Sequence, residues 1–172
     1  MIKQDILENH LKPIYLGIGS NLGDRVNNIN RACYLISQFC VIHKISNLYE
    51  SKSWPNEKFP KYLNIIIKCN TNLEAEILLE NLKSIERQLG RKKNKINYPR
   101  ECDIDIIDFK GYEYKNNYVN IPHPRLSNRN FVLVPLFEID KKWKYPKTDV
   151  SIYKLIEKLG LKSLRSIKIF TN

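Results

Sequence analysis

Pro99-Arg100-Glu101-Cys102-Asp103-Ile104-Asp105-Ile106-Ile107-Asp108 is the most informative segment of this chain. Side chains on a β-strand alternate between faces, so Asp103 and Asp105 project from one side while Ile104 and Ile106 project from the other. Two carboxylates with no cation between them repel each other, and a bound divalent metal removes that repulsion. Oxygen ligands of this kind suit Mg²⁺ and the phosphates it carries. A half-buried strand with a solvated acidic face is the alternative interpretation.

The segments around this strand predict interleaved strands and helices. Residues 73–89 form the strongest predicted helix, because Ile77, Leu78, Leu82, Ile85 and Leu89 make an apolar stripe that Gly90 ends. Asp24 is a suitable N-cap for a second helix. Strands are predicted at residues 14–19, 41–49, 62–68 and 103–109, a helical turn begins 128–136, and a C-terminal helix covers 152–159.

This alternation predicts the α+β class, with one domain at residues 14–172 and an N-terminal extension at residues 1–13. No internal repeat or low-complexity linker marks a second domain. The interleaved strands and helices, with antiparallel pairings, predict a sandwich of two or three layers.

Composition restricts the class of partner and the compartment. The net charge of +11 favours an anionic partner, which is nucleic acid, a membrane surface or a phosphorylated small molecule. The four cysteines form no C-x-x-C pair, so free thiols in a reducing compartment are expected rather than a zinc site or disulfides. The N-terminus does not begin like a signal peptide and no apolar run is long enough for a membrane span, so we expect a cytoplasmic protein.

The glycine-rich segment at residues 17–23, Gly-Ile-Gly-Ser-Asn-Leu-Gly, is not a dinucleotide-binding or P-loop motif. Its third glycine comes one position late for G-x-G-x-x-G, and no Gly-Lys-Ser/Thr follows. We expect these glycines to permit a tight turn and the close approach of a ligand to the end of the first strand.

A basic loop at residues 91–100 leads directly into the acidic strand. Transfer of a polyphosphate group needs this combination, because Mg²⁺ binds phosphate oxygens while guanidinium groups stabilise the charge that develops. A solvated surface loop is the alternative interpretation. His123, held between two prolines and followed by Arg125 and Arg129, is a candidate phosphate contact.

Several ordered motifs together resemble the 6-hydroxymethyl-7,8-dihydropterin pyrophosphokinase family of folate biosynthesis, over about residues 14–146. The matching pieces are Tyr15-Leu16-Gly17-Ile18-Gly19-Ser20-Asn21-Leu22-Gly23-Asp24, Tyr49-Glu50-Ser51 with Trp54, Tyr62-Leu63-Asn64, Ile85-Glu86 with Gly90-Arg91, Pro99-Arg100 before Asp103 and Asp105, and Ile121-Pro122-His123-Pro124-Arg125-Leu126 with Arg129 and Phe131.

The resemblance implies a ferredoxin-like α/β sandwich, in which helices flank a central, mostly antiparallel sheet. It also implies transfer of the β,γ-diphosphate of ATP to the pterin hydroxymethyl oxygen, with release of AMP. It implies that Asp103 and Asp105 hold two Mg²⁺ ions and that Arg91 and Arg100 assist the transfer. The remaining implied roles are ATP binding by Glu86, Ile106, His123 and Arg129, and pterin binding by Gly19, Ser51, Trp54, Tyr62, Asn64 and Phe131. The implied partners are these two small molecules, with no nucleic acid and no membrane, and we expect a monomer.

The chain departs from the family pattern before the two aspartates. Asn97 occupies the position where the family usually has tryptophan, and Tyr98 a position that is usually small. We expect Tyr98 to supply the aromatic cover over the substrates. Ser51-Lys52-Ser53-Trp54-Pro55 likewise replaces the usual Thr-x-Pro-Trp-Gly.

Two other functions compete with this interpretation. A basic nucleic-acid-binding module would account for the net charge, although the sequence carries no aromatic RNP strand and no G-x-x-G loop. A two-metal nuclease would share the carboxylates and the basic loop, but such sites need further carboxylates. Asp108 is predicted on the opposite strand face and is therefore a poor candidate for one.

Overall fold

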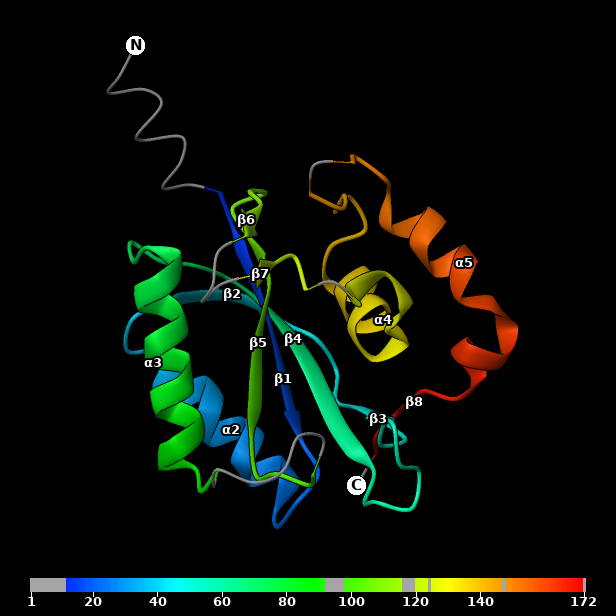
Figure 1. Cartoon of the computed structure of the whole chain (residues 1–172), viewed down its shortest axis with the longest axis horizontal. Helices are drawn as coiled ribbons and strands as arrows, with labels where there is room; N and C mark the ends of the chain where they lie inside the picture. Colours follow the sequence, from blue (N-terminus) through cyan, green and yellow to red (C-terminus); the bar gives the residue numbers. More distant parts are fainter. Residues whose placement is uncertain (1–11, 92–97, 116–119, 124, 147, 172) are drawn as a thin grey trace.

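The computed structural model describes residues 12–91, 98–115, 120–123, 125–146 and 148–171. A central sheet lies between two layers of helices, with α2 and α3 on one face and α4 and α5 on the other (Figure 1). The helices are α2 (Arg25–Ile36), α3 (Ala75–Gln88), the short 3₁₀ helix η1 (Leu126–Asn128), α4 (Asn130–Ile139) and α5 (Ile152–Arg165). The strands are β1 (Ile14–Ser20), β2 (Val41–Ile45), β3 (Tyr49–Ser51), β4 (Tyr62–Asn70), β5 (Asp103–Phe109), β6 (Tyr114–Lys115), β7 (Asn120–Ile121) and β8 (Lys168–Ile169).

The sheet has the order β5-β1-β4-β3-β8, and β2 pairs with the other end of β4. All of these pairs are antiparallel. The connection β1–α2–β2/β3–β4–α3–β5 places β1 and β4 at the centre, as in a ferredoxin-like sandwich. The α+β prediction is therefore confirmed.

Two apolar clusters hold the layers together. One lies between the sheet and helices α2 and α3, and includes Ile29, Leu78 and Ile104. The other lies between the sheet and helices α4 and α5, and includes Ile66, Leu133 and Trp143. Burial of such side chains stabilises each by roughly 1.5–3 kcal/mol relative to exposure. Helices thus cover both faces of the sheet, and the ends of its strands remain accessible to form a site.

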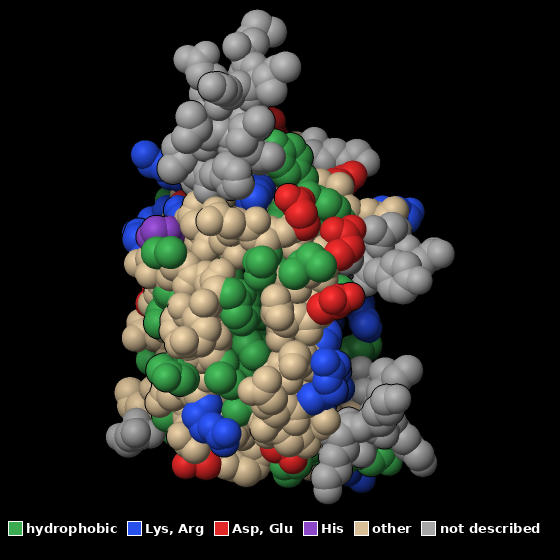
Figure 2. Space-filling model, turned by 90° about the vertical axis from the view of Figure 1, so that its left-hand side faces the viewer, with side chains coloured by type: hydrophobic (Ala, Val, Ile, Leu, Met, Phe, Trp, Pro, Cys, Tyr) green, Lys and Arg blue, Asp and Glu red, His purple; other side chains and the backbone are tan. Residues whose placement is uncertain are grey.

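The helix signals in the sequence correspond to observed contacts. The Asp24 carboxylate accepts a hydrogen bond from Asn27 N at 3.1 Å, as expected of an N-cap. Gly90 follows α3 with φ +104°, a conformation that favours glycine. The predicted apolar stripe of α3 is correct at Leu78, Leu82 and Ile85, but Ile77 is 48% exposed. Figure 2 views this side of the molecule and shows acidic and basic side chains interspersed with hydrophobic ones, so this face is not uniformly basic.

The predicted strand 41–49 is two strands. Ser46 interrupts it, because its N–H donates to Ile66 O at 2.9 Å and its hydroxyl accepts from Ile66 N at 3.0 Å. β2 consequently pairs with the later half of β4, while β3 pairs with the beginning of β4. The predicted C-terminal helix is longer than 152–159 and breaks at Gly160, where φ is +71°.

The prediction that Asp108 lies on the opposite strand face was wrong. The register of β1 and β5 shifts, so that Leu16 pairs with Ile106 but Tyr15 pairs with Asp108. This bulge returns Asp108 to the side of β5 that faces α4. There its carboxylate accepts from Trp143 Nε1 and from Gly111 N, each at 2.8 Å. Burial raises the pKa of Asp108, although these two donors act to lower it. Both Asp108 carboxylate oxygens already accept hydrogen bonds from the fold, so Asp108 remains a poor metal ligand.

No helix in the described part of the chain is long and apolar enough to cross a membrane.

Candidate active site

A cleft of about 700 Å³ lies where β1, β3, β4 and β5 face the beginning of α4. This volume is within the range of small-molecule sites. The cleft contains all the predicted site residues except Glu86 and Ile106: Gly19, Ser51, Trp54, Tyr62, Asn64, Arg91, Arg100, Asp103, Asp105, His123, Arg129 and Phe131. Segments far apart in the sequence therefore meet at one site.

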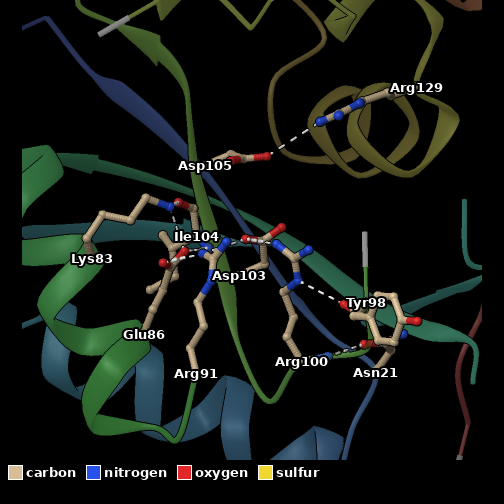
Figure 3. Close-up of polar contacts among 10 residues, drawn as sticks. All are labelled: Asn21, Lys83, Glu86, Arg91, Tyr98, Arg100, Asp103, Ile104, Asp105 and Arg129. Carbon is tan, nitrogen blue, oxygen red and sulfur yellow. Dashed lines mark hydrogen bonds and ion pairs between the residues drawn. The ribbon is translucent and has the colours of Figure 1, made fainter. Parts of the chain in front are cut away.

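The two β5 carboxylates each face arginine side chains (Figure 3). Asp103 Oδ1 accepts from Arg91 Nη1 at 2.9 Å and from Arg100 Nη1 at 3.0 Å. Asp105 Oδ2 lies 3.4 Å from Arg129 Nη1. Burial alone would raise the pKa of Asp103, but Arg100 and Arg91 lower it below its usual value. Arg91 and Arg100 thus favour the anionic form of Asp103, and the arginines around the two carboxylates relieve the repulsion expected between them.

Glu86 is buried in the fold beside this group and does not line the cleft. It is 1% exposed. One carboxylate oxygen accepts from Ile104 N and Lys83 Nζ, each at 2.7 Å, and the other accepts from Arg91. This geometry makes Glu86 a residue that fixes Arg91 against β5.

Ile106 lies by a smaller hollow next to the cleft. This hollow of about 110 Å³ is open along the edge of β5, and Lys83, Asp105 and His123 line both it and the cleft. Its other lining residues are Leu79, Ile104, Asn120 and Ile121, which give it a largely apolar wall. Burial and the nearby Arg129 keep the pKa of His123 below its usual value, although Asp105 acts in the opposite direction. A neutral imidazole therefore joins the two hollows.

Another part of the cleft wall, beside the cations, is aromatic and amide-lined. Asn64 Nδ2 donates to Ser51 Oγ at 3.0 Å, and Gly19 is the partner of Asn64 across the β1–β4 ladder. A Cβ atom on Gly19 would approach Asn64 Oδ1 to 3.1 Å, so glycine keeps this surface open. Tyr62 from β4 and Phe131 from α4 supply rings, and the Arg129 guanidinium lies over the Phe131 ring, 5.5 Å from its centroid. A flat ligand with hydrogen-bonding edges suits such a slot.

Asn21 is a positioning residue to which the sequence analysis gave no role. It is 2% exposed. Its Oδ1 accepts from Arg100 N at 2.8 Å, and its Nδ2 donates to Ser53 Oγ and to Pro60 O, each at 3.1 Å. It therefore ties the segment before β5 to the segment before β4. The signal available in the sequence was an amide directly after a predicted buried strand.

Lys83, Arg125 and Tyr98 are among the other residues that line the cleft. Lys83 could have been found from its i,i+3 spacing to Glu86 on the predicted helix. The Arg125 guanidinium stacks over the Trp54 ring at 4.8 Å across the cleft mouth. Tyr98, expected to provide aromatic cover, lines the cleft and packs against Phe59 with ring centroids 5.4 Å apart. Asn97, the other departure from the family pattern in that loop, lies outside the described residues.

Comparison with protein families finds one match that covers most of the chain. Residues 15–141 match the model of the 7,8-dihydro-6-hydroxymethylpterin-pyrophosphokinase (HPPK) family. A 2-amino-4-hydroxy-6-hydroxymethyldihydropteridine pyrophosphokinase of Aquifex aeolicus is 40% identical over 133 residues, which are 77% of this chain and 83% of that protein. The protein of the same name from Bacillus subtilis is 35% identical over 127 residues, 73% of this chain and 76% of its own length.

Other relatives are longer proteins that the chain matches only in part. The folic acid synthesis protein FOL1 of Dictyostelium discoideum is 36% identical over 80% of this chain, but over only 21% of its own length. A crystal structure of Plasmodium falciparum HPPK-DHPS with pterin and p-hydroxybenzoate superposes with a TM-score of 0.70 at 14% identity, covering 91% of this chain and 44% of that one. At that identity the likeness shows the fold alone.

Proposed function

This chain belongs to the 7,8-dihydro-6-hydroxymethylpterin-pyrophosphokinase family and is a pyrophosphokinase of folate biosynthesis; on that premise, we propose that its cleft binds ATP and 6-hydroxymethyl-7,8-dihydropterin side by side. The hydroxymethyl oxygen attacks the β-phosphorus of ATP, the bond from that phosphorus to the α,β-bridging oxygen breaks, and AMP leaves. The hydroxymethyl proton is lost to solvent or to a product oxygen.

One observation carries the proposal: a single cleft holds paired carboxylates among cations and, beside them, an aromatic, amide-lined slot. The cationic part suits a triphosphate and the slot suits a pterin ring. Such an arrangement places the two reacting groups together, which converts an encounter between two substrates into a reaction between bound neighbours.

Asp103 and Asp105 fit a magnesium site by their chemistry. Both are carboxylates on one face of one strand, and both line the cleft. In the described part of the chain, no group of three His, Cys, Asp or Glu side chains is placed to hold a metal ion, so the remaining ligands of the two proposed ions would be phosphate oxygens and water. Bound Mg²⁺ would neutralise phosphate charge during the transfer.

The arginines change partners in this proposal. Arg91, Arg100 and Arg129 hold the carboxylates when the phosphates are absent, and turn to phosphate oxygens when ATP arrives with its metal. Arg91 and Arg100 then stabilise charge on the transferring group, while His123 and Arg129 bind the triphosphate. The hollow beside Ile106 accepts the nucleotide base. Glu86 acts on nucleotide binding indirectly, because it fixes the position of Arg91.

The pterin lies in the slot formed by Gly19, Ser51, Trp54, Tyr62, Asn64 and Phe131 in this proposal. Asn64 offers both a donor and an acceptor to the ring edge. The chain acts as a cytoplasmic monomer, a setting that agrees with its four free cysteines. Size-exclusion chromatography with light scattering would check the monomer.

The two competing functions have no support. The family match and the curated relatives point to a pyrophosphokinase rather than to a nucleic-acid-binding module or a nuclease. Asp108, the further carboxylate of β5, is held by Trp143 and Gly111.

A binding experiment with two variants tests the division of the cleft. Asn64→Ala should weaken pterin binding and leave the binding of a non-hydrolysable ATP analogue with Mg²⁺ unchanged. His123→Ala should do the opposite. Each lost contact should cost about tenfold in Kd, and calorimetry measures both ligands. If either variant weakened both ligands equally, the proposed division would be wrong.

A further inference from the structure

The C-terminal residues return to the sheet beside the pterin slot. The family match ends at residue 141, and α5 and β8 follow it. Figure 1 shows the chain leaving α5 and reaching the edge of the sheet at β3. We infer that β8 and the adjoining Phe170 form a positioning element that sets the affinity of the slot for the pterin. This inference rests on the proposed function of the cleft.

β3 needs support from β8 because it is only three residues long. Its Tyr49 and Glu50 pair with Ile169 and Lys168, and Phe170 N donates to Leu48 O at 2.8 Å. The next residue of β3 is Ser51, which accepts from Asn64 in the slot. Without β8, this short strand would be the outer edge of the sheet, and its free backbone groups would be exposed. β8 therefore restrains the strand that delivers Ser51.

Arg25 connects Phe170 to the other flank of the slot. Its guanidinium lies over the Phe170 ring, 5.6 Å from the centroid. The same guanidinium donates to Glu50 Oε1 at 3.2 Å and to Lys61 O at 2.9 Å. The Phe170 ring thus packs against an arginine that hydrogen-bonds to Glu50 and Lys61. These two residues directly precede the slot residues Ser51 and Tyr62.

The start of β8 is fixed from the α4 side. Asn130 Nδ2 donates to Ser163 O at 2.6 Å and to Ser166 Oγ at 3.0 Å. Ser166 is the C-cap of α5, two residues before β8. Because Asn130 also lines the cleft, the end of α5 and the cleft wall are held together. β8 consequently reaches β3 along a defined path.

Loss of the β8 and Phe170 contacts should weaken the binding of the pterin and leave the binding of the nucleotide unchanged. The cations proposed for the phosphates come from the end of α3, from the segment before β5 and from the segment before α4. None of them is next to β3 or Lys61 in the sequence. A loosened β3 displaces Ser51, and a loosened Arg25 releases Lys61 and Tyr62. Phe170 touches none of the reacting groups, so it is a positioning residue and not a catalytic one.

The test measures the dissociation constants for the pterin and for the nucleotide in three full-length variants and one shortened chain. Phe170→Ala removes the ring under Arg25, Phe170→Tyr keeps it, and Lys168→Ala alters an exposed side chain of the same strand as a matched control. Pterin binding is followed by tryptophan fluorescence, and binding of a non-hydrolysable ATP analogue with Mg²⁺ by calorimetry. A chain ending at Ser166 removes β8 altogether and gives a second, independent variant.

Phe170→Ala should raise the Kd for pterin about fivefold, whereas the Kd for the nucleotide stays within about twofold. Phe170→Tyr and Lys168→Ala should match the parent, and the shortened chain should lose at least as much pterin affinity as Phe170→Ala. An unchanged pterin Kd in Phe170→Ala would overturn the inference. So would an equal loss for both ligands, which would indicate general loosening of the fold. If the parent chain itself bound no pterin, the proposed function would fail, and this inference with it.

Discussion

At the scale of single residues, Asp103 concentrates the chemistry of the cleft. Two arginines donate to one of its oxygens, at 2.9 and 3.0 Å. Asp103→Asn removes a proposed metal ligand and one charge while it keeps the size of the side chain. Turnover should fall by at least roughly 10²–10³-fold, the loss typical of one electrostatic stabiliser. Steady-state rates at saturating ATP and Mg²⁺ measure this loss.

Asp149→Asn is the matched control for that variant. Asp149 is an exposed carboxylate with φ +54°, a conformation that asparagine tolerates. The turnover rate of Asp149→Asn should equal that of the parent chain, and the melting curves of Asp149→Asn and Asp103→Asn should both remain cooperative. A near-normal rate in Asp103→Asn would contradict the metal-ligand role.

Glu86 gives a prediction about stability. Its buried carboxylate accepts from Lys83, Arg91 and Ile104 N. Glu86→Gln removes the negative charge that faces Lys83 and Arg91, although Arg91 keeps its bond to Asp103 and Lys83 its bond to Ile104 O. Removing one member of a buried ion pair costs about 3–5 kcal/mol, and partial exposure of Lys83 and Arg91 reduces this to about 2–3 kcal/mol. Urea unfolding should show the loss as an earlier midpoint with an unchanged slope. Equal urea midpoints for the parent and Glu86→Gln would contradict this prediction, because they would mean that water hydrates Lys83 and Arg91 as well as Glu86 pairs with them.

At the scale of elements, the close approach of β1 and β4 controls the slot. A Cβ atom on Gly19 would lie 3.1 Å from Asn64 Oδ1 and 3.4 Å from a Tyr62 ring carbon. Gly19→Ala should therefore displace two slot residues and weaken pterin binding about tenfold, while nucleotide binding is kept. Gly17→Ala on the same strand meets the flexible end of Ile107 at 3.2 Å and should have a smaller effect. Fluorescence titration with pterin compares the two, and a larger loss in Gly17→Ala would contradict this account of β1.

The elements also show what could be predicted from sequence. Periodicity and capping were enough for β1, β4, β5, α2 and α3, because each carries its own local signal. The β5 bulge was missed because it depends on pairing with β1, so Asp108 was assigned to the wrong face. β8 was missed because two residues carry no pattern, and only their pairing with β3 makes them a strand.

The site residues follow the same distinction. Motif resemblance brought forward the side chains that line the cleft, including Asp103, Asn64 and Phe131. It did not indicate that arginines neutralise both β5 carboxylates, or that Glu86 is turned away from the cleft and towards Arg91. These facts depend on how the fold orients the end of α3 and the segment before β5 against β5, and on the approach of Arg129 from the start of α4, neither of which the motifs specify.

At the scale of the whole molecule, Asp140 joins the sheet to the α4 layer. Its Oδ2 accepts from Lys68 Nζ at 2.6 Å on β4 and from Tyr15 OH at 2.7 Å on β1. Burial alone would raise the pKa of Asp140, but the hydrogen bonds from Lys68 and Tyr15 outweigh it and lower the pKa below the usual 3.8. A depressed folded-state pKa contributes stability above the unfolded value, and that stability is lost as the pH falls through the folded value.

Asp140→Asn should therefore lower the free energy of unfolding by about 1–3 kcal/mol at pH 7. The difference from the parent should shrink as the pH falls below 3.8. Urea titrations across that range measure it. A constant difference at every pH would show that the charge of Asp140 has no part in the effect.

The central claim for the whole molecule is diphosphate transfer in one cleft. ³¹P NMR of the full chain with ATP, Mg²⁺ and 6-hydroxymethyl-7,8-dihydropterin tests it most directly, because the spectrum distinguishes AMP, ADP and inorganic phosphate. AMP and a pterin diphosphate ester should grow in equal amounts. Neither should form when the pterin is omitted, and both should form at least roughly 10²–10³-fold more slowly in Asp103→Asn. ADP as the main product, or AMP formed at the same rate without pterin, would contradict it.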